Sequence, residues 1–110
     1  MMREIKESDW KILRQLHTVA LERFCERILL EIEQIHSDTT KSFHQKYLQI
    51  YAALRRRDKE IALTFNDLRR STALHQLTAM RARDLLTEEE FSRFSQETRD
   101  SVALVLEILT

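Results

Sequence analysis

The chain contains no glycine and no proline among its 110 residues. Average usage would supply about 8 glycines and about 5 prolines in a chain of this length. Strand-rich folds use glycine for the positive φ angles of their tight hairpins. Walker and dinucleotide loops need it so that the backbone can approach phosphate, and the G-x-S-x-G elbow cannot be built without it. The sequence therefore excludes these loops and argues against sandwiches, barrels and Rossmann folds.

Apolar residues recur every three or four positions almost throughout, which is typical of amphipathic helices. A first helix is expected to begin at Ser8 or Asp9, either of which can cap free N–H groups. It should end near His36, because the polar residues 37–40 can end one helix and cap the next without glycine. A second helix carries a heptad-like stripe of apolar residues. The stripe consists of Phe43, Tyr47, Ile50, Leu54, Ile61, Phe65 and Leu68.

Three shorter helices are expected in the second half of the chain. Asn66 and Asp67 are the predicted break after the second helix, since Asn tolerates left-handed φ and Asp can cap. A third helix should cover about residues 68–85. Thr87 and Glu90 have the spacing of a capping box, which predicts a short fourth helix. Ser95 can cap a fifth helix over residues 96–109.

These elements predict one all-α domain spanning residues 1–110. We expect a bundle of four to five helices built on two long antiparallel helices. The two long helices should join near residues 37–41, because a short polar link makes consecutive helices antiparallel neighbours.

The leading hypothesis for function comes from the amount of apolar helix surface. In the fifth helix the apolar residues between Val102 and Leu109 leave almost no polar face, so that helix should be buried in the bundle or covered by another subunit. Together with the heptad-like second helix, this predicts a non-enzymatic interaction module that self-associates as a homodimer. A monomeric bundle that buries all of this surface is the plainer alternative. The predicted self-association residues are Tyr47, Leu54, Ile61, Val102, Val105, Leu106 and Leu109.

The alternative function is binding of an anionic small molecule or nucleic acid by the Arg-rich middle segment. Residues 39–86 hold 10 basic and 4 acidic side chains. If the third helix begins at Ser71, its free N–H groups and two neighbouring arginines would form an anion site. If it begins at Asp67, which we favour, that site is lost. Nucleic acid is disfavoured because the whole chain has a formal net charge of zero. The candidate residues are Arg55, Arg56, Arg57, Arg69, Arg70 and Ser71.

Arg57 takes the core-like position that the heptad stripe skips. A buried arginine must be paired, so Arg57 could set the register against an acidic group on another helix or subunit. It could equally extend its guanidinium to solvent from the edge of a wide stripe. We favour the second interpretation.

Metal and catalytic chemistry have weaker support. Glu33 and His36 share one helix face, and His44 could join them across the turn to make a surface metal site. We favour the interpretation that these are helix-end histidines that face water and the helix dipole. We therefore expect no cofactor. Cys25 is predicted to be a buried packing residue. His17 is predicted to be partly buried and hydrogen-bonded. No catalytic residue is predicted, and an enzyme is disfavoured.

The sequence also suggests a location and a resemblance. A single cysteine favours a reducing compartment, no secretory signal is visible, and no apolar run approaches the length of a membrane span. We therefore expect a cytoplasmic protein with no membrane partner.

Four segments of the sequence together resemble a family of small bacterial proteins of uncharacterised function. They are residues 8–13 (SDWKIL), 20–25 (ALERFC), 69–73 (RRSTA) and 86–95 (LTEEEFSRFS). That resemblance implies a bacterial cytoplasmic origin and carries no activity or site residues.

Overall fold

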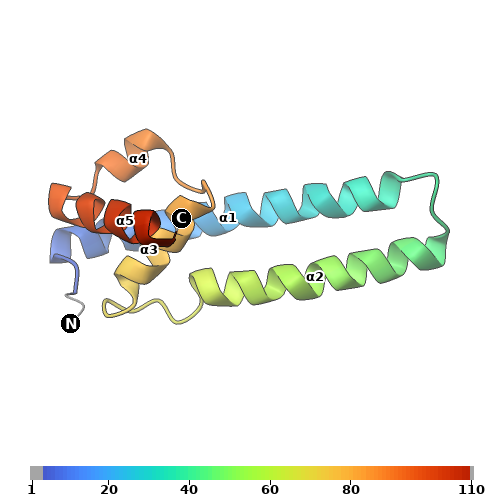
Figure 1. The fold of residues 1–110 in the computed structure, drawn as a ribbon, viewed down its shortest axis with the longest axis horizontal. Helices are drawn as coiled ribbons and strands as arrows, with labels where there is room; N and C mark the ends of the chain where they lie inside the picture. The colour runs from blue at the N-terminus through green and yellow to red at the C-terminus, as the bar shows by residue number, and fades with distance from the viewer. Residues whose placement is uncertain (1–3, 110) are drawn as a thin grey trace.

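The computed structural model describes residues 4–109, and this part of the chain forms five helices and no strand. The helices are α1 (Glu7–Ser37), α2 (Phe43–Phe65), α3 (Ala73–Ala82), α4 (Glu88–Ser92) and α5 (Gln96–Leu109). The long helices α1 and α2 lie side by side and antiparallel, and α3, α4 and α5 gather at one end of the pair (Figure 1). The predicted all-α fold built on two long antiparallel helices is confirmed.

The turn between the long helices forms where the polar cluster predicted it. α1 ends at Ser37, and the Asp38 carboxylate accepts hydrogen bonds from the backbone and hydroxyl of Thr40. Ser42 caps α2, and Gln45 returns a hydrogen bond to the Ser42 backbone to complete a capping box. The predicted start of α1 was wrong. Its cap position is Lys6, and Asp9 uses its carboxylate elsewhere.

The predicted break after α2 at residues 66 and 67 is confirmed, but the two residues exchange their predicted roles. Asn66 was expected to take the left-handed conformation and Asp67 to cap. Asn66 is the C-cap of α2 in extended conformation, and Asp67 takes the left-handed conformation with φ 60°. α3 begins only at Ala73, so the expected helix over residues 68–85 was too long. The Thr72 hydroxyl shapes this link, since it accepts from the Arg69 N–H and lies within hydrogen-bonding distance of the Asp67 and Arg69 carbonyls.

The core lies where the first two thirds of α1 meet α3, α4 and α5, and we call this part the head. Its fully buried side chains include Leu13, Leu77, Met80, Leu85 and Val102. The predicted capping box that opens α4 is confirmed, with Thr87 and Glu90 exchanging hydrogen bonds. Glu90 also accepts a two-pronged ion pair from Arg23 of α1 at 2.6 and 2.9 Å. The Arg23 guanidinium lowers the pKa of Glu90 to about 2.

Asp9 joins the start of α1 to the start of α5. Its buried carboxylate accepts hydrogen bonds from the Ser95 backbone N–H at 2.8 Å, the Ser95 hydroxyl at 2.6 Å and the Thr98 hydroxyl at 2.8 Å. Burial raises the pKa of Asp9, but these hydrogen bonds outweigh it and hold the pKa below its usual value. A carboxylate at a helix N-terminus also meets the positive end of the helix dipole.

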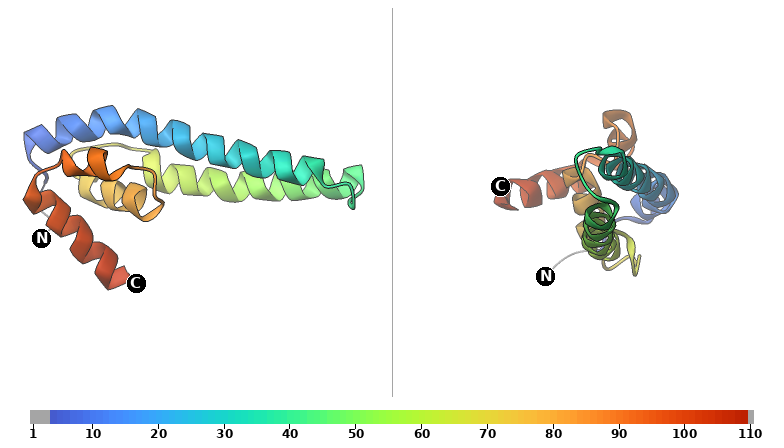
Figure 2. Two further views of the ribbon diagram at one scale, coloured as in Figure 1. Left: turned by 90° about the horizontal axis from the view of Figure 1, so that it is seen from above. Right: turned by 90° about the vertical axis from the view of Figure 1, so that its right-hand side faces the viewer.

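Beyond the head, the last turns of α1 and the first turns of α2 extend as a two-helix hairpin (Figures 1 and 2). The molecule therefore measures 51 × 27 × 25 Å. Its Cα radius of gyration is 16.7 Å, whereas a compact domain of this length has about 13 Å. The hairpin is the feature that makes the chain elongated.

Candidate interaction surface

One side of the hairpin is apolar and uncovered, and we call it the open face. The helices α3, α4 and α5 of the head lie on the other side of the α1–α2 pair, as the end-on view in Figure 2 shows. Several large apolar side chains of the open face are strongly exposed, among them Leu29 at 66%, Tyr47 at 64% and Leu54 at 46%. The open face consists of Cys25, Leu29 and Ile32 from α1 and of Phe43, Tyr47, Ile50, Tyr51, Leu54 and Ile61 from α2.

Helix geometry explains why these residues share one side. Ile28 and Ala53 are buried and mark the line along which α1 and α2 touch. Leu29 follows Ile28, and Leu54 follows Ala53. Each side chain therefore points about 100° around its own helix from the contact line, in the same rotational sense. Because the helices are antiparallel, equal rotations from the contact line lead to the same side of the pair. On this side Ile28 of α1 lines a groove of about 360 Å³ together with Tyr51, Leu54 and Ile61 of α2.

Ion pairs from Arg56 and Arg57 to Glu31 also join the two helices of the hairpin. Arg57 donates to Glu31 of α1 at 2.9 and 3.3 Å and to Glu60 at 2.8 Å, and Arg56 adds a contact to Glu31 at 3.2 Å. The favoured interpretation of Arg57 as a side chain extended to solvent was wrong, because it pairs with a carboxylate of another helix. These hydrogen bonds raise the pKa of Arg57 and lower that of Glu31. The pairing sets the register of α1 against α2.

Aromatic rings and basic groups alternate along the α2 side of the open face. Tyr47 and Tyr51 stack with ring centroids 6.5 Å apart. The Lys46 ammonium lies 5.4 Å from the Phe43 ring centroid, and the Arg55 guanidinium lies 5.7 Å from that of Tyr51. Exposed aromatic rings with cations over them form a surface that is apolar at its centre and charged at its edge, as protein interfaces are.

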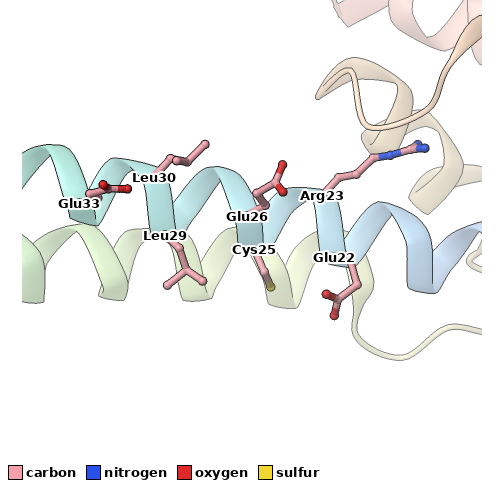
Figure 3. Close-up of a pocket in the computed structure, with 7 residues that line it drawn as sticks. All are labelled: Glu22, Arg23, Cys25, Glu26, Leu29, Leu30 and Glu33. Atoms are coloured by element: carbon pink, nitrogen blue, oxygen red, sulfur yellow. The ribbon is translucent and has the colours of Figure 1, made fainter.

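The α1 side of the open face has an acidic edge. Glu22 and Glu33 are exposed there, whereas Glu26 points to the same side of α1 as Leu30 (Figure 3). Figure 3 shows Cys25 and Leu29 pointing to one side of α1 together with Glu22, while Leu30 points to the other. Cys25 is half-buried, so its expected full burial was wrong.

The arginines proposed for anion binding are mostly engaged by carboxylates. Besides Arg56 and Arg57, Arg69 pairs with Asp67, and Arg70 donates to the Ile5 carbonyl at 2.9 Å and to Glu7 at 3.0 Å. Arg55 lies over Tyr51 instead. The expected start of α3 at Asp67 was wrong, since the helix begins two residues after the exposed Ser71. Even so, both nearby arginines are held by acids, which weighs against an anion site there.

The metal hypothesis finds no support in the arrangement of side chains. Glu33, His36 and His44 are all exposed. Within residues 4–109, no group of three or more His, Cys, Asp or Glu side chains is placed to hold a metal ion. His17 has the predicted structural role, because its Nε2 lies 2.9 Å from the Phe65 carbonyl and its ring packs edge-on against the Phe65 ring.

The predicted self-association residues fall on two separate surfaces. Tyr47, Leu54 and the partly buried Ile61 belong to the open face. Val102 is fully buried in the head, so assigning it to an interface was wrong. Val105 and Leu106 are partly buried, while Leu109 is 73% exposed at the end of α5. The α1 half of the open face was missed, although Cys25, Leu29 and Ile32 have the helical spacing that could have revealed it.

None of the helices within residues 4–109 combines the length and the apolar character needed to cross a membrane. No protein-family model, curated protein or solved structure matches the chain. The resemblance to a small bacterial family therefore stays a prediction.

Proposed function

We propose that the chain is a non-enzymatic helical interaction module that self-associates as a homodimer through the open face. The observation that carries the proposal is the exposure of Leu29, Tyr47 and Leu54 along one side of a hairpin that projects from the head. A helix with an apolar stripe must bury it against another element to be stable in water. Within this chain the head covers the other side only.

The exposed area supports the same proposal. The chain exposes 7652 Å², whereas monomeric proteins of its mass, 13.2 kDa, expose about 6400 Å². The excess of about 1200 Å² exceeds the roughly 800 Å² that each partner buries in a standard protein interface. An interface with a second copy that buries about 1200 Å² of each chain would bring its exposed area to the value expected for a folded protein of this size.

The residues at the centre of the surface also fit an interface better than a reactive site. Aromatic residues are enriched in interface cores, and charged residues are depleted there. On the open face Tyr47 and Tyr51 stack on each other, and Tyr51 shares a groove with Leu54 and Ile61. The single cysteine supports a reducing compartment such as the cytoplasm for this module.

The test of this proposal is the solution mass of the native chain, measured by light scattering over a series of concentrations at two salt concentrations. We expect a mass of 26.4 kDa, twice that of the 13.2 kDa chain, at low micromolar concentration. The dimer should persist in high salt, because burial of apolar surface dominates the association. A mass of 13.2 kDa up to about 1 mM, where pairing would be worth only about 4 kcal/mol, would overturn the proposal.

A further inference from the structure

We infer that the two copies pair side by side with their hairpin tips pointing the same way, so that α1 of each copy packs on α2 of the other. The result is a four-helix bundle in which every neighbouring pair of helices is antiparallel. This inference rests on the proposed self-association and adds the arrangement of the two chains. It follows from the symmetry of a homodimer and from the charges that border the open face.

A symmetric pair of open faces allows two arrangements. The twofold axis of a homodimer must lie in the plane between the two faces. If the axis runs parallel to the helices, α1 faces the partner's α2 and both heads lie at the same end. If the axis crosses the helices at right angles, α1 faces the partner's α1, α2 faces the partner's α2, and the heads lie at opposite ends.

The charge distribution favours the axis parallel to the helices. The α1 edge carries Glu22 and Glu33, whereas the α2 side of the open-face groove carries Arg55 and Asp58, one charge of each sign. An axis across the helices would set the acidic α1 edge against its own copy, and like charges at an interface are repulsive. The parallel axis sets that edge beside Arg55 of the partner, which already lies over the open-face ring of Tyr51.

The apolar side chains also meet in the parallel arrangement. Ile28 shares the open-face groove with Leu54 and Ile61, so this turn of α1 is level with that part of α2. A twofold axis parallel to the helices leaves each residue at its own level along the bundle. Leu29 of one copy therefore meets Leu54 of the other at the centre of the bundle. The heads do not obstruct this contact, because their helices α3, α4 and α5 lie on the sides of the α1–α2 pairs that face away from the open faces (Figure 2).

Disulfide trapping between two single-cysteine variants tests the arrangement. Both variants carry Cys25→Ser; one adds Leu29→Cys and the other Leu54→Cys. The two are mixed in equal amounts, oxidised under native conditions and analysed on non-reducing gels. Each variant has a single cysteine, so every disulfide that forms must join two chains.

In the parallel arrangement the mixture should give a covalent dimer containing about half of the chains, which is the statistical share of mixed pairs for a twofold dimer. Each variant alone should give almost none. If the mixture does not crosslink while light scattering shows dimers of both variants, the arrangement is overturned and the proposed self-association stands. If the native chain is a monomer by light scattering, the proposed function and this inference fail together.

Discussion

Leu54→Asp is expected to convert the dimer into folded monomers and to weaken association at least about 100-fold. Leu54 is 46% exposed in the single chain, so the head and the helices tolerate a polar residue there. In the dimer both copies would place an unpaired aspartate in an apolar interface, at a combined cost of about 3 kcal/mol or more. The measurement is the dissociation constant from sedimentation or light scattering, with circular dichroism to confirm that helix content is retained.

Leu63→Asp is the matched control for this prediction. Leu63 lies on the same helix and is 72% exposed, but it is not part of the open face. The substitution introduces the same side chain into the same helix, so its effects on charge and helix propensity are closely comparable. We expect the Leu63→Asp variant to dimerise with the dissociation constant of the native chain. Equal weakening by both substitutions, or by neither, would show that the open face is not the interface.

Asp9→Ala should lower the free energy of unfolding by about 3 kcal/mol, because it removes a buried carboxylate that accepts three hydrogen bonds. The Ser95 N–H and the Thr98 hydroxyl would lose a charged acceptor where water has little access. Urea unfolding of the variant and the native chain at one protein concentration measures the difference. Asp9→Asn is the control, and it should lose about half as much because one carbonyl oxygen remains to accept.

The contribution of Asp9 should also depend on pH. Its pKa is lowered in the folded chain, so the carboxylate stabilises the fold at any pH above its unfolded pKa of about 3.9. That stabilisation is lost as the pH falls from there through the folded pKa. The stability difference between the native chain and Asp9→Ala should therefore shrink below about pH 4. A difference that is constant from pH 7 to pH 3 would contradict the assigned role.

Helix ends were largely predictable because their signals are local. The Thr87–Glu90 capping box and the polar turn at residues 37–41 involve residues within four positions of each other. Asp9 and Arg57 were misassigned because their partners, Ser95 and Glu31, lie far away in the sequence. No spacing rule relates such residues until the helices are placed in space.

The candidate surface was predicted on one helix and missed on the other. The heptad-like spacing pointed to Tyr47 and Leu54, which the structure leaves exposed. Leu29 was left out because all of the predicted self-association residues came from the second and fifth helices. Val102 was included because its neighbours are apolar, yet it fills the core of the head. Apolar periodicity alone does not separate a side chain that packs inside the chain from one that a partner covers.

The central claim is that the open face is covered by a second copy, and hydrogen exchange measured at several protein concentrations tests it most directly. The informative backbone amides are those of residues 28–36 and 43–57, which form the hairpin beyond the head. Raising the concentration from well below to well above the dissociation constant should slow their exchange at least about tenfold, because pairing suppresses local opening. Exchange in α4 should change little. Hairpin rates that are independent of concentration, while the solution mass doubles, would place the interface elsewhere and contradict the account.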